Sequence, residues 1–403
     1  MTTPRQNLLR ICGHGTPEWI PLVTHVDPYN QPSRDGMDPE LREALGEVCW
    51  GSEATVTLSR YLDLDIMDWY GMPVRVTRGG VAVEQQVEGD VTTQVWHTPQ
   101  GDLREVIRVC RDTTGAVSSN RTEHLVKGPE DLPALAAIFA DEILEPDPEG
   151  IERTRRRREL IGADGLLLGP MEGTPLGMMF RVYSGVATLA YLWADAPDAL
   201  RDLFAVMERN YLQRLTIGVP SDIDAVVGVD DTSTTVISPA MFEEFNLDLT
   251  DRRADACHQA GKLYFHHSCG LIRDLLPLYR RTRMDAVHAF TPPPIGDVTI
   301  PDGRKALGER IAICGGVAAM SDESWDPAAM RESIRELFAG IGVEDRVILS
   351  LAAYPHRTVS QMREVVEECR KYQTLGRTRV RRAARPADCR SAGGRPERKE
   401  GEP

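Results

Sequence analysis

Short apolar segments alternate with longer amphipathic segments through the second half of this chain. From about residue 160 onwards, runs rich in β-branched and apolar residues are separated by stretches in which apolar residues recur at helical spacing. The apolar runs predict strands at 165–169, 224–229, 262–266, 285–290, 310–316 and 346–351. The amphipathic stretches predict helices at 192–215, 239–260, 271–282, 326–340 and 357–373.

Strands and helices that alternate with short links are typical of parallel strands joined by right-handed crossovers. Six such strands, with one or two more in the first half, predict an α/β protein with a TIM (β/α)8 barrel. A doubly wound open sheet is the alternative, although no GxGxxG motif follows any of the predicted strands.

The first 155 residues follow a different pattern. Helical spacing covers 39–48 and 53–70, and apolar and polar residues then alternate with a period of two over 74–127. Turn signals that contain glycine divide this last stretch at 78–80, 88–90 and 99–101. We therefore expect an antiparallel β meander.

These patterns predict three regions. Residues 1–155 form an N-terminal extension that carries the meander and packs on the barrel. Residues 156–373 form the main part of the (β/α)8 barrel, and residues 374–403 form a disordered basic tail.

The charge of the chain is unevenly distributed. The formal net charge is −14, whereas residues 374–403 contain nine Arg or Lys and four Asp or Glu, a net of +5. Residues 1–373 therefore carry −19. That value argues against nucleic acid as the main partner, because a nucleic-acid binder needs a basic face. An arm that binds nucleic acid or a protein is the alternative to a disordered tail without a specific role.

The composition also indicates the cellular compartment in which the protein is expected. Hydrophobic residues make up 41% and charged residues 27%, which are ordinary values for a globular protein. The longest apolar run, at 132–140, is about half the length of a membrane span. The first 15 residues lack the apolar segment of a secretory signal, and eight cysteines are too few for a disulfide scaffold. We expect a cytoplasmic protein with free thiols and no membrane partner.

Polar residues stand at the carboxyl ends of the predicted strands, where TIM barrels carry their chemistry. They are Glu172, Asp230, Asp231, His266, His267, Cys269, His288, Cys314, Tyr354 and His356. The residues that we expect to be catalytic are Asp230, Asp231 and His356. The residues that we expect to bind substrate are Glu172, His288 and Tyr354.

His267 and Cys269 form the sharpest candidate for a metal site. Residues two apart in a strand face the same side, and imidazole and thiolate are donors that zinc prefers. His266 would then point to the opposite face as a hydrogen-bonded core residue. A catalytic zinc site has three protein ligands. The candidates for the third are His356, Cys314, Asp231 and Glu172. The alternative is that both residues pack at the barrel mouth without a metal.

Three segments resemble the uroporphyrinogen decarboxylase superfamily. They are VGVDDTSTTVISPAMFEEF (227–245), FHHSCGLIRDLLPLY (265–279) and GDVTIPDGRKALGERIAICGGV (296–317). The shared pattern is Asp-Asp, Ile-Ser-Pro-x-Met-Phe, His-x-Cys-Gly, a leucine-rich helix, Leu-Gly-x-Arg and Gly-Gly. The resemblance covers about residues 10–373 and is nearest to the branch of cobamide-dependent methyltransferases and O-demethylase components.

The resemblance implies a barrel enzyme that transfers methyl groups. In the methyltransferase branch, zinc is held by His-x-Cys and a later cysteine, and it activates a thiol that takes a methyl group from methylcobalamin. The segment where that cysteine is expected reads SLAAYP at 350–355. On this interpretation zinc is the cofactor, and the partner is a small-molecule or corrinoid-protein methyl donor. His267 and Cys269 hold the metal, and Asp231 is the acid/base or orienting group.

Two other functions stay open. True uroporphyrinogen decarboxylases use an N-terminal arginine-rich segment, an aspartate, a tyrosine and a late histidine, without a cofactor. The corresponding GHGTPEWIPL at 13–22 contains no arginine. In a tetrapyrrole decarboxylase, Asp231 would stabilise a protonated pyrrole. The absent cysteine is also compatible with a barrel that binds a ligand without catalysis.

Removal of residues 374–403 should leave the melting temperature unchanged, because disordered residues contribute little to the folded state. Thermal unfolding of the full-length and truncated proteins tests this expectation. A drop of several degrees on truncation would contradict it.

Overall fold

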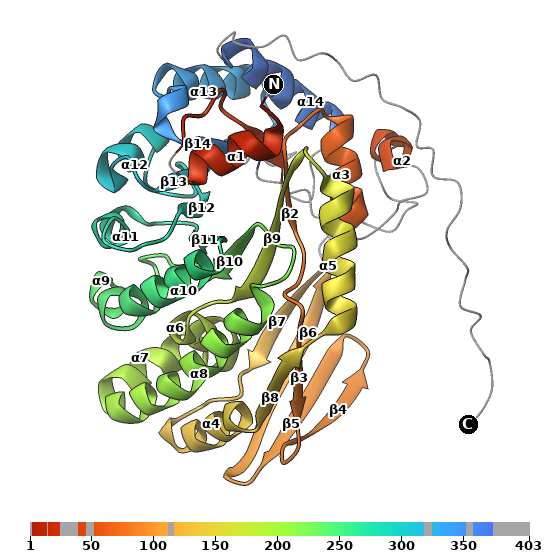
Figure 1. Ribbon diagram of the computed structural model, residues 1–403. Coiled ribbons are helices and arrows are strands. Elements are labelled where there is room, and N and C mark those ends of the chain that lie inside the picture. Colours follow the sequence, from red (N-terminus) through yellow and green to blue (C-terminus); the bar gives the residue numbers. More distant parts are fainter. Residues whose placement is uncertain are drawn as a thin grey trace, which may run out of the picture.

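Eight parallel strands form a barrel at the centre of the protein (Figure 1). The structure is a computed structural model and describes residues 2–13, 15–24, 39–45, 52–111, 117–317, 325–351 and 358–373. The barrel strands, in order around the sheet, are β1 (Leu22–Thr24), β2 (Ile66–Trp69), β9 (Gly165–Glu172), β10 (Ala225–Val229), β11 (Leu263–His267), β12 (Ala286–Phe290), β13 (Ala312–Val317) and β14 (Val347–Leu351). The predicted (β/α)8 barrel is confirmed, and the six strands predicted after residue 160 are all present.

The beginning of the chain closes the barrel. The backbone N–H of Asp65 donates to the carbonyl of Leu22 at 3.0 Å and bridges the seam between β1 and β2. Helix α1 (Pro4–Cys12) buries Leu8 and Ile11 against the inward-facing residues of the strands. Its backbone bonds to residues just before β9 and β14, so α1 covers the amino-terminal end of the barrel. The opposite, carboxyl end of the strands is left for the site.

Helices follow the strands and cover the outside of the barrel. They are α2 (Pro39–Leu45), α3 (Ser52–Tyr61), α5 (Pro148–Ile161), α6 (Pro175–Met178), η4 (Met179–Tyr183), α7 (Gly185–Asp195), α8 (Pro197–Gly218), α9 (Pro239–Met241), η5 (Phe242–Asn246), α10 (Leu247–Gln259), η6 (Arg273–Leu275), α11 (Leu276–Tyr279), α12 (Ile300–Leu307), α13 (Pro327–Ala339), η8 (Val343–Asp345) and α14 (Val359–Tyr372). The helix predicted at 192–215 is divided at Ala196, because Pro197 begins α8, and proline favours the first helical position.

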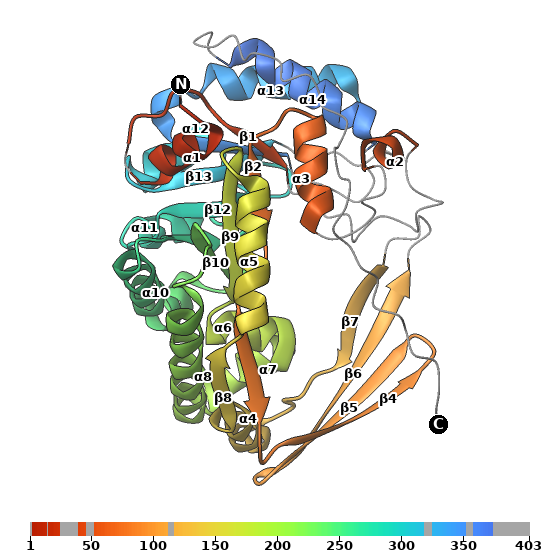
Figure 2. The same cartoon turned by 45° about the vertical axis from the view of Figure 1, so that its right-hand side comes forward.

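An antiparallel insertion separates β2 from α5 (Figure 2). Its elements are β3 (Val74–Arg78), β4 (Ala82–Glu88), β5 (Val91–Thr98), β6 (Gly101–Arg111), β7 (Val117–Glu123), η3 (Pro129–Asp131), α4 (Leu132–Ala140) and β8 (Glu142–Pro146). β4 to β7 form the predicted meander, whereas β3 leaves it and pairs with β8. The division into an extension, a barrel and a tail stays a prediction.

One predicted helix is partly wrong. Helical spacing predicted a helix over 53–70, but α3 ends at Tyr61 and Ile66–Trp69 form β2. Residues 66–68 are buried, so this strand shows no alternation of apolar and polar residues. A short strand that is buried on both faces cannot be distinguished from a helix by periodicity alone.

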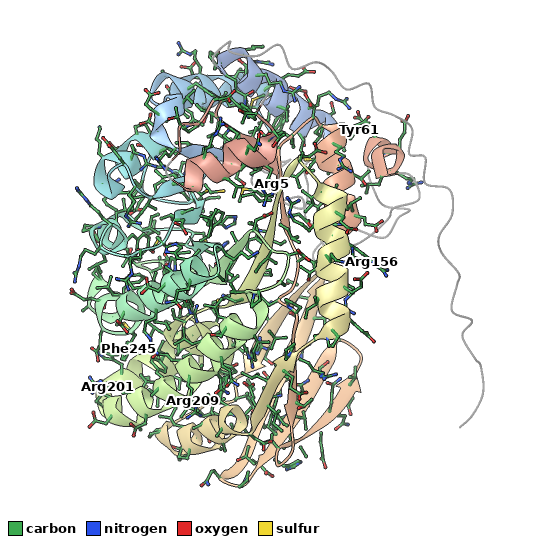
Figure 3. The ribbon with its side chains drawn as sticks, viewed as in Figure 1. Arg5, Tyr61, Arg156, Arg201, Arg209 and Phe245 are labelled. Atoms are coloured by element: carbon green, nitrogen blue, oxygen red, sulfur yellow. The ribbon has the colours of Figure 1, made fainter. Side chains whose placement is uncertain are left out.

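A buried ion pair joins β2 to the helix that follows the insertion. Asp68 faces outward from β2, and its carboxylate accepts a hydrogen bond from Nε of Arg157 on α5 at 2.5 Å. Both side chains are at most 4% exposed. On the same helix Arg156 points into solvent (Figure 3) and pairs with the exposed Glu152. No helix among the described residues is long and apolar enough to span a membrane.

Arg157→Met should lower the free energy of unfolding by about 3–5 kcal/mol, because it leaves the Asp68 carboxylate buried without its partner. Arg156→Met is the matched control and should cost less than about 1 kcal/mol, since exposed pairs contribute little. The double variant Asp68→Leu/Arg157→Met should recover part of the loss. Urea denaturation measures all three, and equal losses for the two arginine variants would contradict the expectation.

Candidate metal and active site

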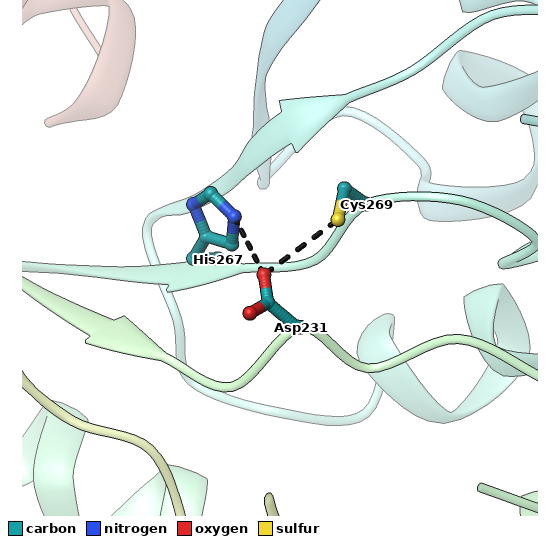
Figure 4. Close-up of side chains that lie close together, drawn as sticks. All are labelled: Asp231, His267 and Cys269. Atoms are coloured by element: carbon teal, nitrogen blue, oxygen red, sulfur yellow. Dashed lines mark hydrogen bonds and ion pairs between the residues drawn. The ribbon is translucent and has the colours of Figure 1, made fainter. Parts of the chain in front are cut away.

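Three side chains from neighbouring strand ends converge at the carboxyl end of the barrel (Figure 4). Nε2 of His267 lies 2.9 Å from Oδ1 of Asp231, and Sγ of Cys269 lies 3.6 Å from the same oxygen. One ligand atom from each residue can be chosen so that all three lie within 4.8 Å of one another. Among the described residues, this is the group of potential ligands that could hold a metal ion.

The period of the strands explains this convergence. Phe265 on β11 faces the barrel interior, so His267 and Cys269, two and four residues later, continue on the same side. On β10, Val227 and Val229 face the barrel interior, and Asp231, two residues after Val229, lies on the same side. β10 and β11 pair in parallel with Val229 opposite His267, which places both loops at one rim.

Asp231 is held from two sides. Its Oδ1 faces His267, and its Oδ2 lies 3.0 Å from Nε of Arg181 on η4. Burial alone would raise the pKa of Asp231, but the hydrogen bond and charge of His267, with Arg181, lower it below its usual value. The backbone at Asp231 has a φ of 50°, in the left-handed region where a non-glycine residue is strained. A carboxylate held in this way remains ionised near neutral pH.

The Cys269 thiol is a weak acid in this environment. Burial, and then the negative charge of Asp231, raise the pKa of its thiol to about 11. The thiol is therefore protonated at neutral pH until a cation displaces its proton.

His288 and Trp69 surround the outer side of His267. The Nδ1 atoms of His267 and His288 are 2.9 Å apart, so one must donate and the other accept. The Trp69 ring lies edge-on to His267, with ring centroids 5.9 Å apart, and 5.2 Å from His288. When Nε2 of His267 serves as a metal ligand, its Nδ1–H donates to His288 and fixes the tautomer, as the outer partners of metal-bound histidines do.

Asp230 lies behind the loop rather than beside Asp231. Its side chain is fully buried, accepts a hydrogen bond from the backbone N–H of Thr174, and lies 3.3 Å from Nδ1 of His266. His266 is also fully buried, which lowers its pKa and keeps it neutral. His266 thus occupies the core position expected of it. The catalytic role of Asp230 stays a prediction.

Glu172 and Cys314, which belong to the described part of the chain, are not part of this cluster. Glu172 forms an ion pair with Arg214 on α8 and lines a cavity of about 240 Å³ next to the insertion. Cys314 is buried among the inward-facing core residues of the barrel. Tyr354 and His356 lie outside the described residues. Of the third-ligand candidates within the described chain, Asp231 is the one that joins His267 and Cys269.

Sequence reasoning missed Arg181 and Trp69. Trp69 lay in a segment predicted to be helical, and no motif marks Arg181, which follows Thr174 by seven residues on a short π-helical segment. Both residues are far from Asp231 and His267 along the chain, so no spacing pattern in the sequence connects them to the site. Only recognition of β2 as a barrel strand could have placed Trp69 at the mouth.

The ends of β10 and β11 supply these donors, which define a TIM-barrel protein with a candidate metal centre. The sequence matches the family profile "Uroporphyrinogen decarboxylase (URO-D)" over residues 148–372, so the chain belongs to the uroporphyrinogen decarboxylase family. The resemblance found in the sequence is thereby confirmed. No curated protein gives a significant sequence match.

One solved structure shares the fold of this chain at low sequence identity. A methyltransferase from Methanosarcina mazei superposes with a TM-score of 0.60 at 15% identity, over 92% of this chain and 99% of that one. A B12-independent methionine synthase from Shewanella sp. W3-18-1 gives a TM-score of 0.49 at 8% identity, over 88% and 97%. At this identity the Methanosarcina protein shows a shared fold.

The donor set fits zinc. Imidazole, thiolate and carboxylate are all zinc ligands, and three protein ligands with one open position are typical of catalytic zinc sites. Bonds of about 2.0–2.3 Å place two ligands of a tetrahedral ion about 3.3–3.8 Å apart. The 3.6 Å between Sγ of Cys269 and Oδ1 of Asp231 falls within this range, and the 2.9 Å between Nε2 of His267 and the same oxygen is a hydrogen-bond distance slightly below it.

Asp231→Asn should increase the rate at which iodoacetamide alkylates Cys269 in chelator-treated protein at pH 8. The thiolate is the reactive form, and removal of the neighbouring negative charge lowers the raised pKa of the thiol. Mass spectrometry of the peptide that contains Cys269 measures the rate, with a several-fold increase expected. Asp198→Asn, at an exposed and distant carboxylate, is the control and should leave the rate unchanged. A slower reaction in the Asp231 variant would contradict the expectation that the charge of Asp231 raises the pKa of the Cys269 thiol.

Proposed function

We propose that this protein is a zinc-dependent methyltransferase whose methyl donor is a corrinoid or another small methylated molecule. The observation that carries the proposal is the convergence of Asp231, His267 and Cys269 at the barrel mouth. The Methanosarcina structure of the same fold, described as a methyltransferase, adds support. The family as a whole is enzymatic, which favours catalysis over simple binding.

In this proposal His267 supplies Nε2, Cys269 supplies its thiolate and Asp231 supplies Oδ1. Arg181 retains the second carboxylate oxygen, so that one oxygen of Asp231 faces the metal. His288 accepts the Nδ1 proton of His267 and leaves the Nε2 lone pair free. Trp69 forms an apolar wall beside both imidazoles.

When bound, zinc lowers the pKa of a thiol or hydroxyl on the methyl acceptor, so that the acceptor is an anion near neutral pH. The acceptor anion forms its bond to the methyl carbon as the bond from that carbon to the donor breaks. Asp231, His267 and Cys269 would hold the ion at the rim and thereby determine where the acceptor lies. The acceptor loses its proton to solvent before its bond to the methyl carbon forms.

Decarboxylation of a tetrapyrrole is the second candidate, because the family is named for it. That reaction would use Asp231 as a carboxylate opposite a protonated pyrrole, and the lowered pKa of Asp231 suits this role. However, decarboxylation assigns no role to Cys269, whose Sγ lies beside Oδ1 of Asp231. Metal content therefore distinguishes the two candidates, and ligand binding without turnover would favour a non-catalytic barrel.

About one zinc ion per chain should copurify with the protein, and Cys269→Ala should remove it together with methyl transfer. A site with three protein ligands cannot lose its thiolate and keep a tight ion. His267→Ala and Asp231→Ala should act in the same direction. Elemental analysis after dialysis measures the metal. Zinc-free protein that decarboxylates a porphyrinogen at full rate would overturn the proposal.

His266→Ala is the matched control for His267→Ala. It should destabilise the protein and weaken zinc binding far less than His267→Ala does, because His266 lies on the opposite face of β11, is fully buried and offers no atom to the metal. Thermal unfolding and zinc content separate the two effects. Loss of zinc with no change in stability would contradict this arrangement.

Zinc affinity should fall as the pH is lowered from 8 to 6. The Cys269 thiol, with a pKa of about 11 without metal, must lose its proton to bind, so each pH unit should cost about tenfold or more in affinity. Competition with a chromophoric chelator at several pH values measures the slope. An affinity independent of pH would exclude Cys269 as a ligand.

A further inference from the structure

Three buried hydroxyl groups meet directly behind the candidate metal site. The Tyr279 hydroxyl lies 2.6 Å from Oγ1 of Thr232 and 2.8 Å from Oγ of Ser268. Oγ1 of Thr232 in turn lies 2.9 Å from Oγ of Ser268, so the three oxygens form a closed triangle. All three side chains are fully buried.

The triangle connects the two loops that carry the candidate ligands. Thr232 directly follows Asp231, and Ser268 stands between His267 and Cys269. Tyr279 belongs to neither loop, because it is the last residue of α11. Ser268 also donates to the backbone carbonyl of Thr232 at 2.8 Å, which adds a direct link between the loops.

These links matter because both loops lie beyond the regular sheet. β10 ends at Val229 and β11 ends at His267, so Asp231 and Cys269 lack strand pairing on either side. The strand ladder therefore fixes His267 but not its two companions. Beyond the sheet, the backbone N–H of Ser268 donates to the carbonyl of His288 at 2.9 Å, and that of Thr234 donates to the carbonyl of Leu271 at 2.8 Å. Side-chain hydrogen bonds supply the other links around Asp231 and Cys269.

A second layer of buried groups supports the triangle. Nε2 of His266 lies 3.1 Å from Oγ1 of Thr232, and its Nδ1 faces the Asp230 carboxylate. Arg253 on α10, also fully buried, donates to the carbonyls of Glu172 and Gly173 at the end of β9. Each group in this layer has a partner on a different loop, so the layer joins the ends of β9, β10 and β11.

We propose that Tyr279 is a positioning residue, which sets the distance between Asp231 and the His267–Cys269 pair through Thr232 and Ser268. The proposal rests on the proposed function, because it assigns the purpose of the triangle to the metal site. The hydrogen bonds of the Tyr279 hydroxyl go to Thr232 and Ser268, not to the side chains of the candidate ligands. Its ring packs on Phe242 and His266, with ring centroids 5.1 and 5.5 Å apart, so removal of the hydroxyl alone preserves the packing.

Tyr279→Phe and Thr232→Val test the proposal against two controls. Thr232→Ser keeps the central hydroxyl and should behave as the wild type. Thr154→Val removes a fully buried hydroxyl from α5, where Oγ1 of Thr154 donates to the carbonyl of Gly150 at 2.8 Å, far from the site. It controls for the loss of stability that follows from any missing buried hydrogen bond.

Zinc affinity and the spectrum of the Co²⁺-substituted protein are the main measurements. Tyr279→Phe and Thr232→Val should bind zinc about 10- to 100-fold more weakly than the wild type, the range seen for groups that orient metal ligands. Their Co²⁺ spectra should shift, whereas Thr154→Val should change neither. Equal zinc affinity in Tyr279→Phe and the wild type, or an equal loss in Thr154→Val, would overturn the positioning role and leave the metal proposal intact.

Hydrogen exchange supplies a readout that does not depend on metal. Mass spectrometry should show faster amide exchange at 230–235 and 267–272 in Tyr279→Phe, with no change in α5. If the wild type binds no zinc, this result would still support the link between the loops while the proposed function fails. Unchanged exchange in both loops would overturn the positioning role whatever the metal result.

Discussion

The alternation of side chains across parallel strands is the constraint on which this site depends. At the ends of β10 and β11, the side chains of consecutive residues point to opposite faces, so one residue of each polar pair faces the mouth and the other supports it from behind. Asp231 and His267 face the mouth, whereas their neighbours Asp230 and His266 face the surrounding helices. The sequence Asp-Asp followed by His-His therefore encodes a reactive layer and a supporting layer, rather than a cluster of four equivalent groups. The carboxylate and imidazole in each layer face one another, at 2.9 Å in front and 3.3 Å behind.

The insertion is attached to the rim by a chain of alternating charges. Glu142 on β8, whose side chain is 1% exposed, forms ion pairs with Arg78 on β3 and with Arg214 on α8. Arg214 continues to Glu172 at the end of β9. A buried carboxylate with two guanidinium partners is costly to separate from either of them. These ion pairs connect the small sheet of β3 and β8 to the end of β9, which borders the site. The carboxylate of Glu172 is the last group in this series, because it is paired with Arg214.

The barrel strands could be predicted from the sequence because their burial produces a regular pattern of apolar residues. Six barrel strands appear as uninterrupted apolar runs, because a parallel strand covered by helices on one side and core on the other is buried on both faces. The same property hid β2, whose four residues continue the helical spacing of α3. At the site, the two-residue spacing of His267 and Cys269 was enough to place both on one face. Asp231 could be named only as one of four candidates for the third position, because its place depends on the register between β10 and β11. Arg181 had no signal, since its contact with Asp231 arises only when η4 folds over the rim.

The proposed ligand set also has a chemical consequence that follows from replacing a thiolate by a carboxylate. The resemblance to the methyltransferase branch implies a second cysteine, and the structure offers Asp231 in the position nearest to His267 and Cys269. Both residues are anionic as ligands, so one histidine, one cysteine and one aspartate balance the charge of a divalent ion just as one histidine and two cysteines do. A carboxylate is a harder donor that transfers less electron density than sulfur. A zinc ion held by Asp231 would therefore withdraw more charge from the acceptor at its open position and lower the pKa of that acceptor further. The ion pair with Arg181 reinforces this effect, because it draws charge from the opposite oxygen of the same carboxylate. In the proposed zinc site, the pairing of Asp231 with Arg181 would thus favour acceptors that are less acidic than thiols as well as thiols themselves.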